Sequence, residues 1–273
     1  MAIPNNPATA LDTILRKVAT SGATTVGEGW KLTLGAEPGT AEFALRHGEA
    51  VGLMNKVLAH LTSLDPGEVE SRLYLQYVPA WHGAVVFRDG WGRTDQPASK
   101  IIRLPILDHL MGLGLHMEVQ RRAVYPELSD DKLENLRESL AEWRKLVEEA
   151  GLPTDLAQQV KTLVDHIDWL LSNTETFGTE PVMENARTLF GLSVPVIRFA
   201  DGKWKKTVVA AMAGLVLFLN PIADATEEAN RILTNVSETV SEIREFGSPE
   251  PQKALPPGDG ANVTADDESA SDQ

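Results

Sequence analysis

The stretch that decides the fold is residues 129–171, SDDKLENLRESLAEWRKLVEEAGLPTDLAQQVKTLVDHIDWLL. Each half repeats apolar residues at steps of three and four, which places them on one face of an α-helix. The connection Ala150-Gly151-Leu152-Pro153 has glycine before proline, the usual order at a helix end. Because so short a loop makes its helices antiparallel neighbours, the stretch predicts an αα-hairpin with a coiled-coil-like seam. The predicted seam consists of Leu133, Leu136, Leu140, Trp143 and Val147, facing Leu156, Val160, Leu163, Ile167 and Leu170.

Towards the C-terminus, residues 208–219 form a run of twelve residues without a polar side chain. As a helix the run spans about 18 Å, well short of the roughly 30 Å hydrocarbon layer, which favours a buried core helix. The run is nevertheless apolar on every face, and a Trp among lysines precedes it, as in helices at membrane interfaces. We therefore expect an apolar helix over 207–223, either in the core, in a membrane, or in the core and also at an oligomer interface. The residues expected at a membrane or partner interface are Trp204, Lys205, Lys206, Met212, Leu215, Leu217 and Phe218.

Two further segments follow this run. Residues 224–243 have apolar residues at helical spacing and predict another helix. Residues 247–273 contain four prolines, three glycines, no aromatic residue and six acidic residues against one lysine. Such a segment buries too little apolar surface to offset its ordering entropy, so we expect a disordered acidic tail.

The N-terminal residues are less regular. Apolar spacing predicts helices over 9–18 and 42–64. Short strands are expected at 30–34, 84–87 and 100–104, the last two joined by a Gly- and Pro-rich loop, while 72–78 fits either a strand or a helix. The fold class expected is thus mainly α: a helical bundle with a small irregular α+β or β-hairpin element in the N-terminal part. The expected organisation is 1–104 for that part, 105–246 for the helical part, with the hairpin at 129–171 and the apolar helix at 207–223, and 247–273 for the tail.

The segment 81–95, which includes the first of these two strands and most of the loop after it, gathers aromatic, basic and acidic side chains around glycines. Aromatic planes stack on ligands and arginine forks bind anions, so the loop is a candidate ligand site. The alternative, which the sequence favours, is a hairpin turn at Asp89-Gly90 with the tryptophans packed in the core. The candidate ligand-binding residues are Trp81, His82, Arg88, Trp91, Arg93 and Asp95.

Composition excludes several classes of protein. The 273 residues carry a formal charge of −14 and no cysteine, so disulfides, thiolate nucleophiles and Cys-ligated metals are ruled out. The acidity argues against nucleic-acid binding, which needs dense Lys and Arg. No H-E-x-x-H, G-x-S-x-G, Walker A or G-x-G-x-x-G motif is present, so the sequence favours a non-enzyme without a cofactor.

The histidines give no metal site. His109 and His116 are seven residues apart and share a helix face, but a zinc site needs three or four ligands and the sequence ties no third ligand to them. His166 lies beside the hairpin seam, where we expect it to pair with a carboxylate.

Three functions remain open. The first is a non-enzymatic interaction protein whose apolar helix docks on or inserts into a membrane, as in a toxin-like or host-defence effector. The second is a soluble helical scaffold or oligomer with that helix in its core, and the third is a sensor or enzyme using the loop. The N-terminus has no secretory pattern, so we expect a cytoplasmic protein, membrane-associated on the cytoplasmic side if the helix docks. The expected partners are a membrane surface, another protein or a second copy.

Overall fold

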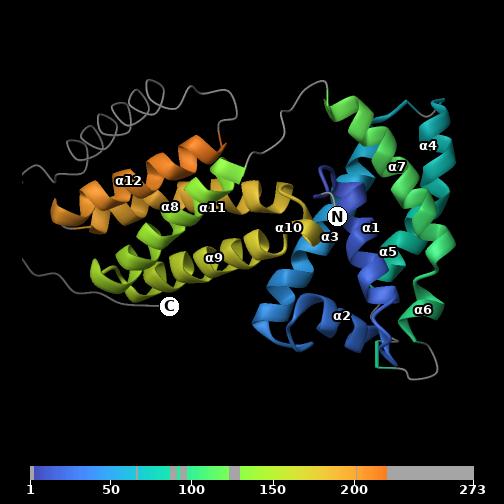
Figure 1. Cartoon of the computed structure of the whole chain (residues 1–273), viewed down its shortest axis with the longest axis horizontal. Helices are drawn as coiled ribbons and strands as arrows, with labels where there is room; N and C mark the ends of the chain where they lie inside the picture. Colours follow the sequence, from blue (N-terminus) through green and yellow to red (C-terminus); the bar gives the residue numbers. More distant parts are fainter. Residues whose placement is uncertain are drawn as a thin grey trace, which may run out of the picture.

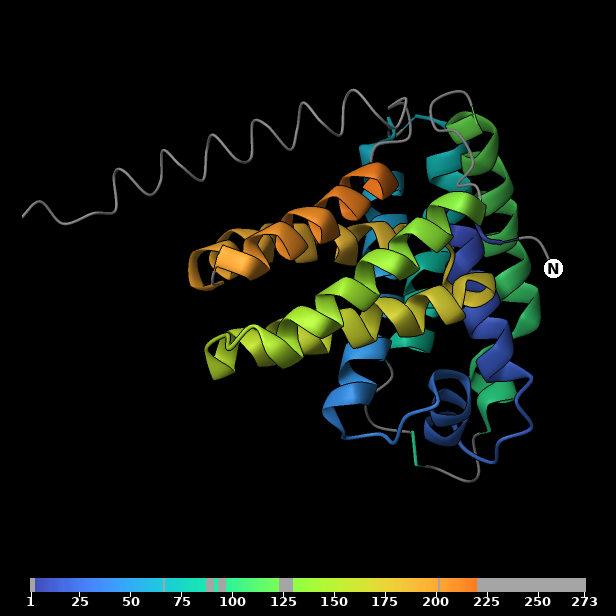
Figure 2. The same ribbon diagram turned by 60° about the vertical axis from the view of Figure 1, so that its left-hand side comes forward.

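The computed structural model describes residues 3–65, 67–86, 91–92, 97–122, 130–200 and 202–219. Over these residues the chain is mainly helical and contains no strand. The helices form two groups, a bundle of helices of mixed length and an arm of helices of similar length that projects from it (Figures 1 and 2). The N-terminal bundle comprises α1 (Pro7–Ala19), α2 (Val26–Leu34), α3 (Ala41–Ser63), α4 (Val69–Tyr74), the 3₁₀ turn η1 (Leu75–Tyr77), α5 (Val78–Val85), α6 (Ala98–Ile101) and α7 (Leu104–Arg122).

The arm contains the predicted hairpin and two further long helices. A short helix, α10, connects α9 to α11 where the arm meets the bundle (Figure 1). The helices of this part are α8 (Asp130–Glu149), α9 (Thr154–Ser172), α10 (Thr174–Phe177), α11 (Glu180–Phe199) and α12 (Gly202–Leu219).

Helix α1 is the centre of the bundle. It packs against α2, α3, α6, α7 and α10, and nine of its thirteen residues are buried. The side chain of Asn6 starts the helix by accepting hydrogen bonds from the backbone N–H groups of Ala8 and Thr9, and Pro7 occupies the first turn. The predicted helices at 9–18 and 42–64 are confirmed as α1 and α3.

The predicted β element is wrong. Residues 30–34 belong to α2, where Trp30 and Leu34 are buried one helical turn apart and Leu32 is 58% exposed, so their apparent alternation is the spacing of a helix. Thr25 caps the start of α2, and Gly35, at φ 61°, ends it. Most described residues of the other two predicted strands lie in helices, with Ala84 and Val85 in α5, Lys100 and Ile101 in α6 and Leu104 in α7. Residues 72–78 adopt the helical alternative.

The predicted αα-hairpin is confirmed as α8 and α9. Gly151 takes φ 66° in the connection, and the seam is buried except for Val147, Leu156 and Leu163, which are half-buried. Helix α12 lies along α8 and also packs on α11, with the Ser139 hydroxyl donating to the backbone carbonyl of Ala211 at 2.7 Å. The predicted apolar helix is described as far as Leu219. Residues 220–223, the predicted helix at 224–243 and the predicted tail lie outside the described residues.

Candidate functional site

The predicted ligand loop is described only in part. Trp81, on α5, is fully buried, and its indole N–H donates to the backbone carbonyl of Ile106 at 3.0 Å. His82, on the same helix, is exposed. Arg88, Arg93 and Asp95 lie outside the described residues.

Trp91 joins an aromatic cluster at the base of the bundle. Its ring lies 6.2 Å from that of Trp30 in a stacked arrangement, and 5.9 Å and 5.2 Å from Phe43 and His47 in edge-on contacts. Its backbone carbonyl accepts from the N–H of Gly27 on α2. The cluster thus fixes the described piece of the loop to α2 and α3 through packing, the kind of contact that a structural tryptophan makes.

His47 is held inside this cluster as a neutral ring. Its Nε2 lies 2.9 Å from the backbone carbonyl of Val85, and burial lowers the pKa of the imidazole. Because a neutral ring needs its N–H at Nε2 to donate to that carbonyl, the contact also selects the tautomer. His47 therefore serves the packing between α3 and α5.

The residues predicted at a membrane or partner interface fall on two sides of α12. The side chains of Trp204, Met212, Leu215 and Phe218 are buried within the chain. Lys206 is exposed, and Lys205 and Leu217 are half-exposed. Over the described residues no helix combines the length and the apolarity that crossing a membrane requires.

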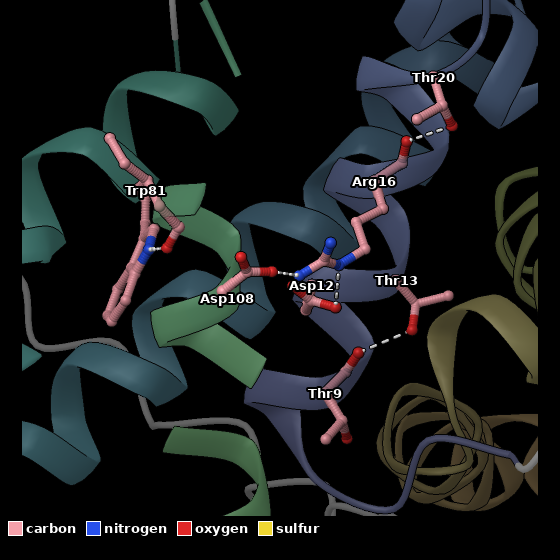
Figure 3. Close-up of polar contacts among 8 residues, drawn as sticks. Thr9, Asp12, Thr13, Arg16, Thr20, Trp81 and Asp108 are labelled. Atoms are coloured by element: carbon pink, nitrogen blue, oxygen red, sulfur yellow. Dashed lines mark hydrogen bonds and ion pairs between the residues drawn. The ribbon is translucent and has the colours of Figure 1, made fainter. Parts of the chain in front are cut away.

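A charge cluster at the contact of α1 with α7 is the least expected feature of the bundle. It consists of Asp12, Arg16 and Asp108 and is called the α1–α7 charge cluster below (Figure 3). Arg16 Nε donates to Asp12 Oδ2 at 2.8 Å, and its NH2 group donates to Asp108 Oδ1 at 2.7 Å. The guanidinium thereby bridges a carboxylate of its own helix and one of the neighbouring helix.

The two carboxylates of this cluster differ sharply in solvation. The Asp108 side chain is 68% exposed, whereas that of Asp12 is 0% exposed and its Oδ1 has no hydrogen-bond partner. Burial raises the pKa of Asp12 above its ordinary value, the bond to Arg16 opposes this, and the nearby Asp108 adds to it. The bond to Asp12 in turn raises the pKa of Arg16. Asp12 is therefore a carboxyl whose ionised form the fold solvates incompletely.

A second polar group joins the arm to the bundle. Glu49 of α3 accepts hydrogen bonds from His166 Nε2 of α9 at 2.7 Å and from Asn185 Nδ2 of α11 at 2.9 Å. These three residues are called the junction below. The His166 side chain is 1% exposed, so the predicted pairing of this histidine with a carboxylate is confirmed, with a partner 117 residues away in the chain.

Charged contacts flank the junction on α3. The Arg46 guanidinium lies 4.5 Å from the ring centroid of Trp169, which stacks on His166. Two turns beyond Glu49 in the other direction, Lys56 pairs with Glu184 at 2.6 Å and with Glu180 at 3.6 Å. One face of α3 thus contacts the arm through polar groups, while its buried apolar residues face the bundle core.

Three further histidines of the bundle are His60 on α3 and His109 and His116 on α7. Glu70 lies between His60 Nε2 at 3.2 Å and His116 Nε2 at 3.5 Å. His109 stacks on Tyr77 with 3.9 Å between ring centroids, so it points to a different partner from His116. Among the described residues no group of three His, Asp or Glu side chains is placed to hold a metal ion.

Neither the charge cluster nor the junction partner of His166 was singled out from the sequence. Arg16 and Asp108 are 92 residues apart, and no motif links them. The one usable signal was Asp12 itself, an acidic residue in the middle of the predicted helix 9–18 on a face of apolar neighbours.

A scan against protein-family models and searches of curated proteins and of solved structures found no match.

Proposed function

We propose that the chain is a non-enzymatic helical scaffold that keeps its apolar helix in its own core and presents the arm and the bundle to partner proteins. The observation that carries the proposal is the burial of α12. Val208, Ala211, Leu215 and Phe218 are at most 1% exposed, at the spacing of one helix face. A helix with this much apolar surface already covered gains little by leaving its own chain.

Close backbone packing supports the same interpretation. A Cβ at Gly214 would lie 2.7 Å from the Ser139 Cβ, so α12 and α8 approach each other at a point where only glycine fits. The Ser139 hydroxyl bonds the Ala211 carbonyl beside it. Contacts of this kind specify one partner surface for α12, as expected of a core helix.

The test is detergent-free purification of the full chain, followed by light scattering and by sedimentation with membranes. The scaffold proposal expects a monodisperse particle that stays in the supernatant after carbonate extraction. Leu217→Asp, on the half-exposed side of α12, is expected to leave this behaviour unchanged. A carbonate-resistant membrane pellet of the wild type that Leu217→Asp abolishes would contradict the scaffold.

The second candidate is docking on a membrane surface through the outer side of α12. What favours it is that side's composition: Val209, Ala210, Val216 and Leu217 are half-exposed or exposed, and Lys205 and Lys206 precede them. Lysines near anionic lipid headgroups contribute about 1 kcal/mol each. Binding to anionic vesicles that is lost with Leu217→Asp, together with growth arrest and membrane depolarisation on overexpression, would favour this candidate. Harmless overexpression and no vesicle binding would exclude it.

A further inference from the structure

The contact between α1 and α7 has two dissimilar ends. The helices run antiparallel, with Asn6 and Thr9 beside Gly114 and Arg16 beside Asp108. At the first end the Asn6 Nδ2 donates to the Gly114 carbonyl at 3.0 Å, and a Cβ at Gly114 would lie 2.5 Å from Thr9 Cγ2. That end is closely packed and fully bonded.

The other end is held by the α1–α7 charge cluster, and one of its polar atoms has no partner. Asp12 Oδ1 is buried and unbonded, so ionised Asp12 keeps one oxygen without a donor while the contact is closed. Separation of the two helices at this end would let water reach that oxygen. The neutral carboxyl has much less to gain from water than the carboxylate.

We propose that the α1–α7 contact is a pH-dependent local opening, in which the start of α7 separates from α1 at the charge cluster more readily when Asp12 is ionised than when it is protonated. The packed end at Gly114 stays closed and acts as the pivot. The arm, which meets the bundle where α10 packs on α1 and at the junction on α3, takes no part in this opening.

The charged surroundings of Asp12 agree with this direction. Within the described part of the chain, the charged groups that shift the pKa of Asp12 are Arg16 on α1 and Asp108 on α7, and none comes from α2, α3, α6 or α10. Burial is the largest influence, and it raises the pKa of the carboxyl in the closed state. The contribution of Asp12 to closure is therefore complete at acid pH and is lost as the pH rises through its closed-state pKa.

The experiment is native-state hydrogen exchange of the full chain at about pH 4, near the ordinary carboxyl pKa, and at about pH 8, with rates corrected for the intrinsic pH dependence of exchange. Amides of α1 and of the first half of α7 are compared with those of α9 and α11. We expect the α1 and α7 protection factors to fall with rising pH, relative to the arm, by about tenfold per pH unit separating the closed- and open-state pKa values.

Asp12→Asn keeps the shape of the side chain and removes its titration, so it is expected to abolish the relative change. Asp131→Asn, at an exposed position on α8, is the matched control and is expected to leave the change intact. Equal pH responses of bundle and arm in the wild type, or a response that persists in Asp12→Asn, would overturn the proposal.

A second variant keeps the proposal falsifiable if Asp12→Asn fails to fold. Asp108→Asn leaves Asp12 in place and removes the like charge that raises its pKa. The pH response should become smaller, and the carboxyl resonance of Asp12 should titrate at a lower pH than in the wild type. An Asp12 resonance that titrates at the ordinary carboxyl value in the wild type would overturn the proposal.

Discussion

In the arm, helices of 18 to 20 residues lie along one another and bury a stripe of side chains each, whereas in the bundle helices of 4 to 23 residues surround α1. The polar side chains His166 and Asn185 of the arm bond Glu49 at its contact with α3. The bundle encloses the Asp12 carboxylate, one oxygen of which has no hydrogen-bond partner. The arm thus obtains its order from a repeated pattern, and the bundle from individual contacts between distant residues.

The largest effect is expected from a substitution that disrupts the core of the arm and leaves the bundle intact. Leu215→Asp places a carboxylate in the core between α12 and its neighbours, where Leu215 is 0% exposed. We expect a loss of about 4 kcal/mol or more in the free energy of unfolding, because a methyl-rich side chain is lost and a charge is buried. Urea denaturation followed by circular dichroism measures the loss.

Leu217→Asp, two residues away on the half-exposed side, is the control for this prediction and is expected to cost about 1 kcal/mol or less. Hydrogen exchange should show that Leu215→Asp lowers the protection of α9 and α11 more than that of α1. Equal losses for the two substitutions would mean that α12 is not fixed against α8, and the arm would not be a patterned core.

The bundle is tested at Gly114. A Cβ there would lie 2.5 Å from Thr9 Cγ2 and 3.0 Å from the Thr9 backbone nitrogen, so Gly114→Ala forces α7 away from α1. We expect a loss of about 2 to 3 kcal/mol, the usual cost of overpacking. Thermal and urea unfolding measure it.

Gly214→Ala is the counterpart in the arm, where the new Cβ would meet the Ser139 side chain at 2.7 Å. The Gly214 clash is with a short side chain and the Gly114 clash reaches backbone, so Gly114→Ala should be the more damaging of the two. The reverse order would show that the arm, and not the bundle, depends on single close approaches.

This difference explains which parts of the fold can be predicted from sequence. The hairpin of α8 and α9 can be predicted because its apolar residues fall on the same helix face over about four turns in each helix. In α2 only Trp30, Leu32 and Leu34 carry the signal, and three residues at alternate positions fit a strand as well as a helix. The packing of Trp30 against His47 and Trp91, which lie far along the chain, decides between them.

The polar groups were harder still to predict. Asp12 is buried among the helices that surround α1, and its partner Arg16 also pairs with Asp108, far along the chain. His166 could be assigned a carboxylate partner but not Glu49, since spacing within one helix says nothing about a neighbouring helix. Apolar periodicity reports only local order within one helix, so it does not predict which residues of distant helices pair with each other.

The junction between bundle and arm gives the next prediction. Glu49→Ala leaves buried His166 without its acceptor and removes one partner of Asn185, whose amide still reaches the Pro181 carbonyl. We expect a loss of about 2 kcal/mol in the free energy of unfolding, the cost of a buried polar group left unpaired. Fluorescence of Trp169, which stacks on His166, should report the change, together with urea unfolding.

Lys56→Ala removes the neighbouring ion pairs with Glu180 and Glu184, which are partly exposed, and should cost only about 0.5 kcal/mol. A larger loss in the free energy of unfolding for Lys56→Ala than for Glu49→Ala would mean that the ion pairs of Lys56, and not the junction, fix the arm to the bundle. High salt would then weaken the wild-type contact, and it should not do so if Glu49 dominates.

The smallest effect expected is a gain, and it probes the bundle and the arm with the same substitution. Gly48 in α3 and Gly191 in α11 are exposed helical glycines, and a Cβ at either would meet no atom within 4 Å. Alanine should therefore stabilise each protein by about 0.5 to 1 kcal/mol through the lower entropy of its unfolded chain. Thermal unfolding of both variants measures the gain. Equal gains would show that the two regions differ in their packing and not in the stability of their exposed helix faces, whereas a loss at Gly48 alone would mean that this face of α3 is covered in solution.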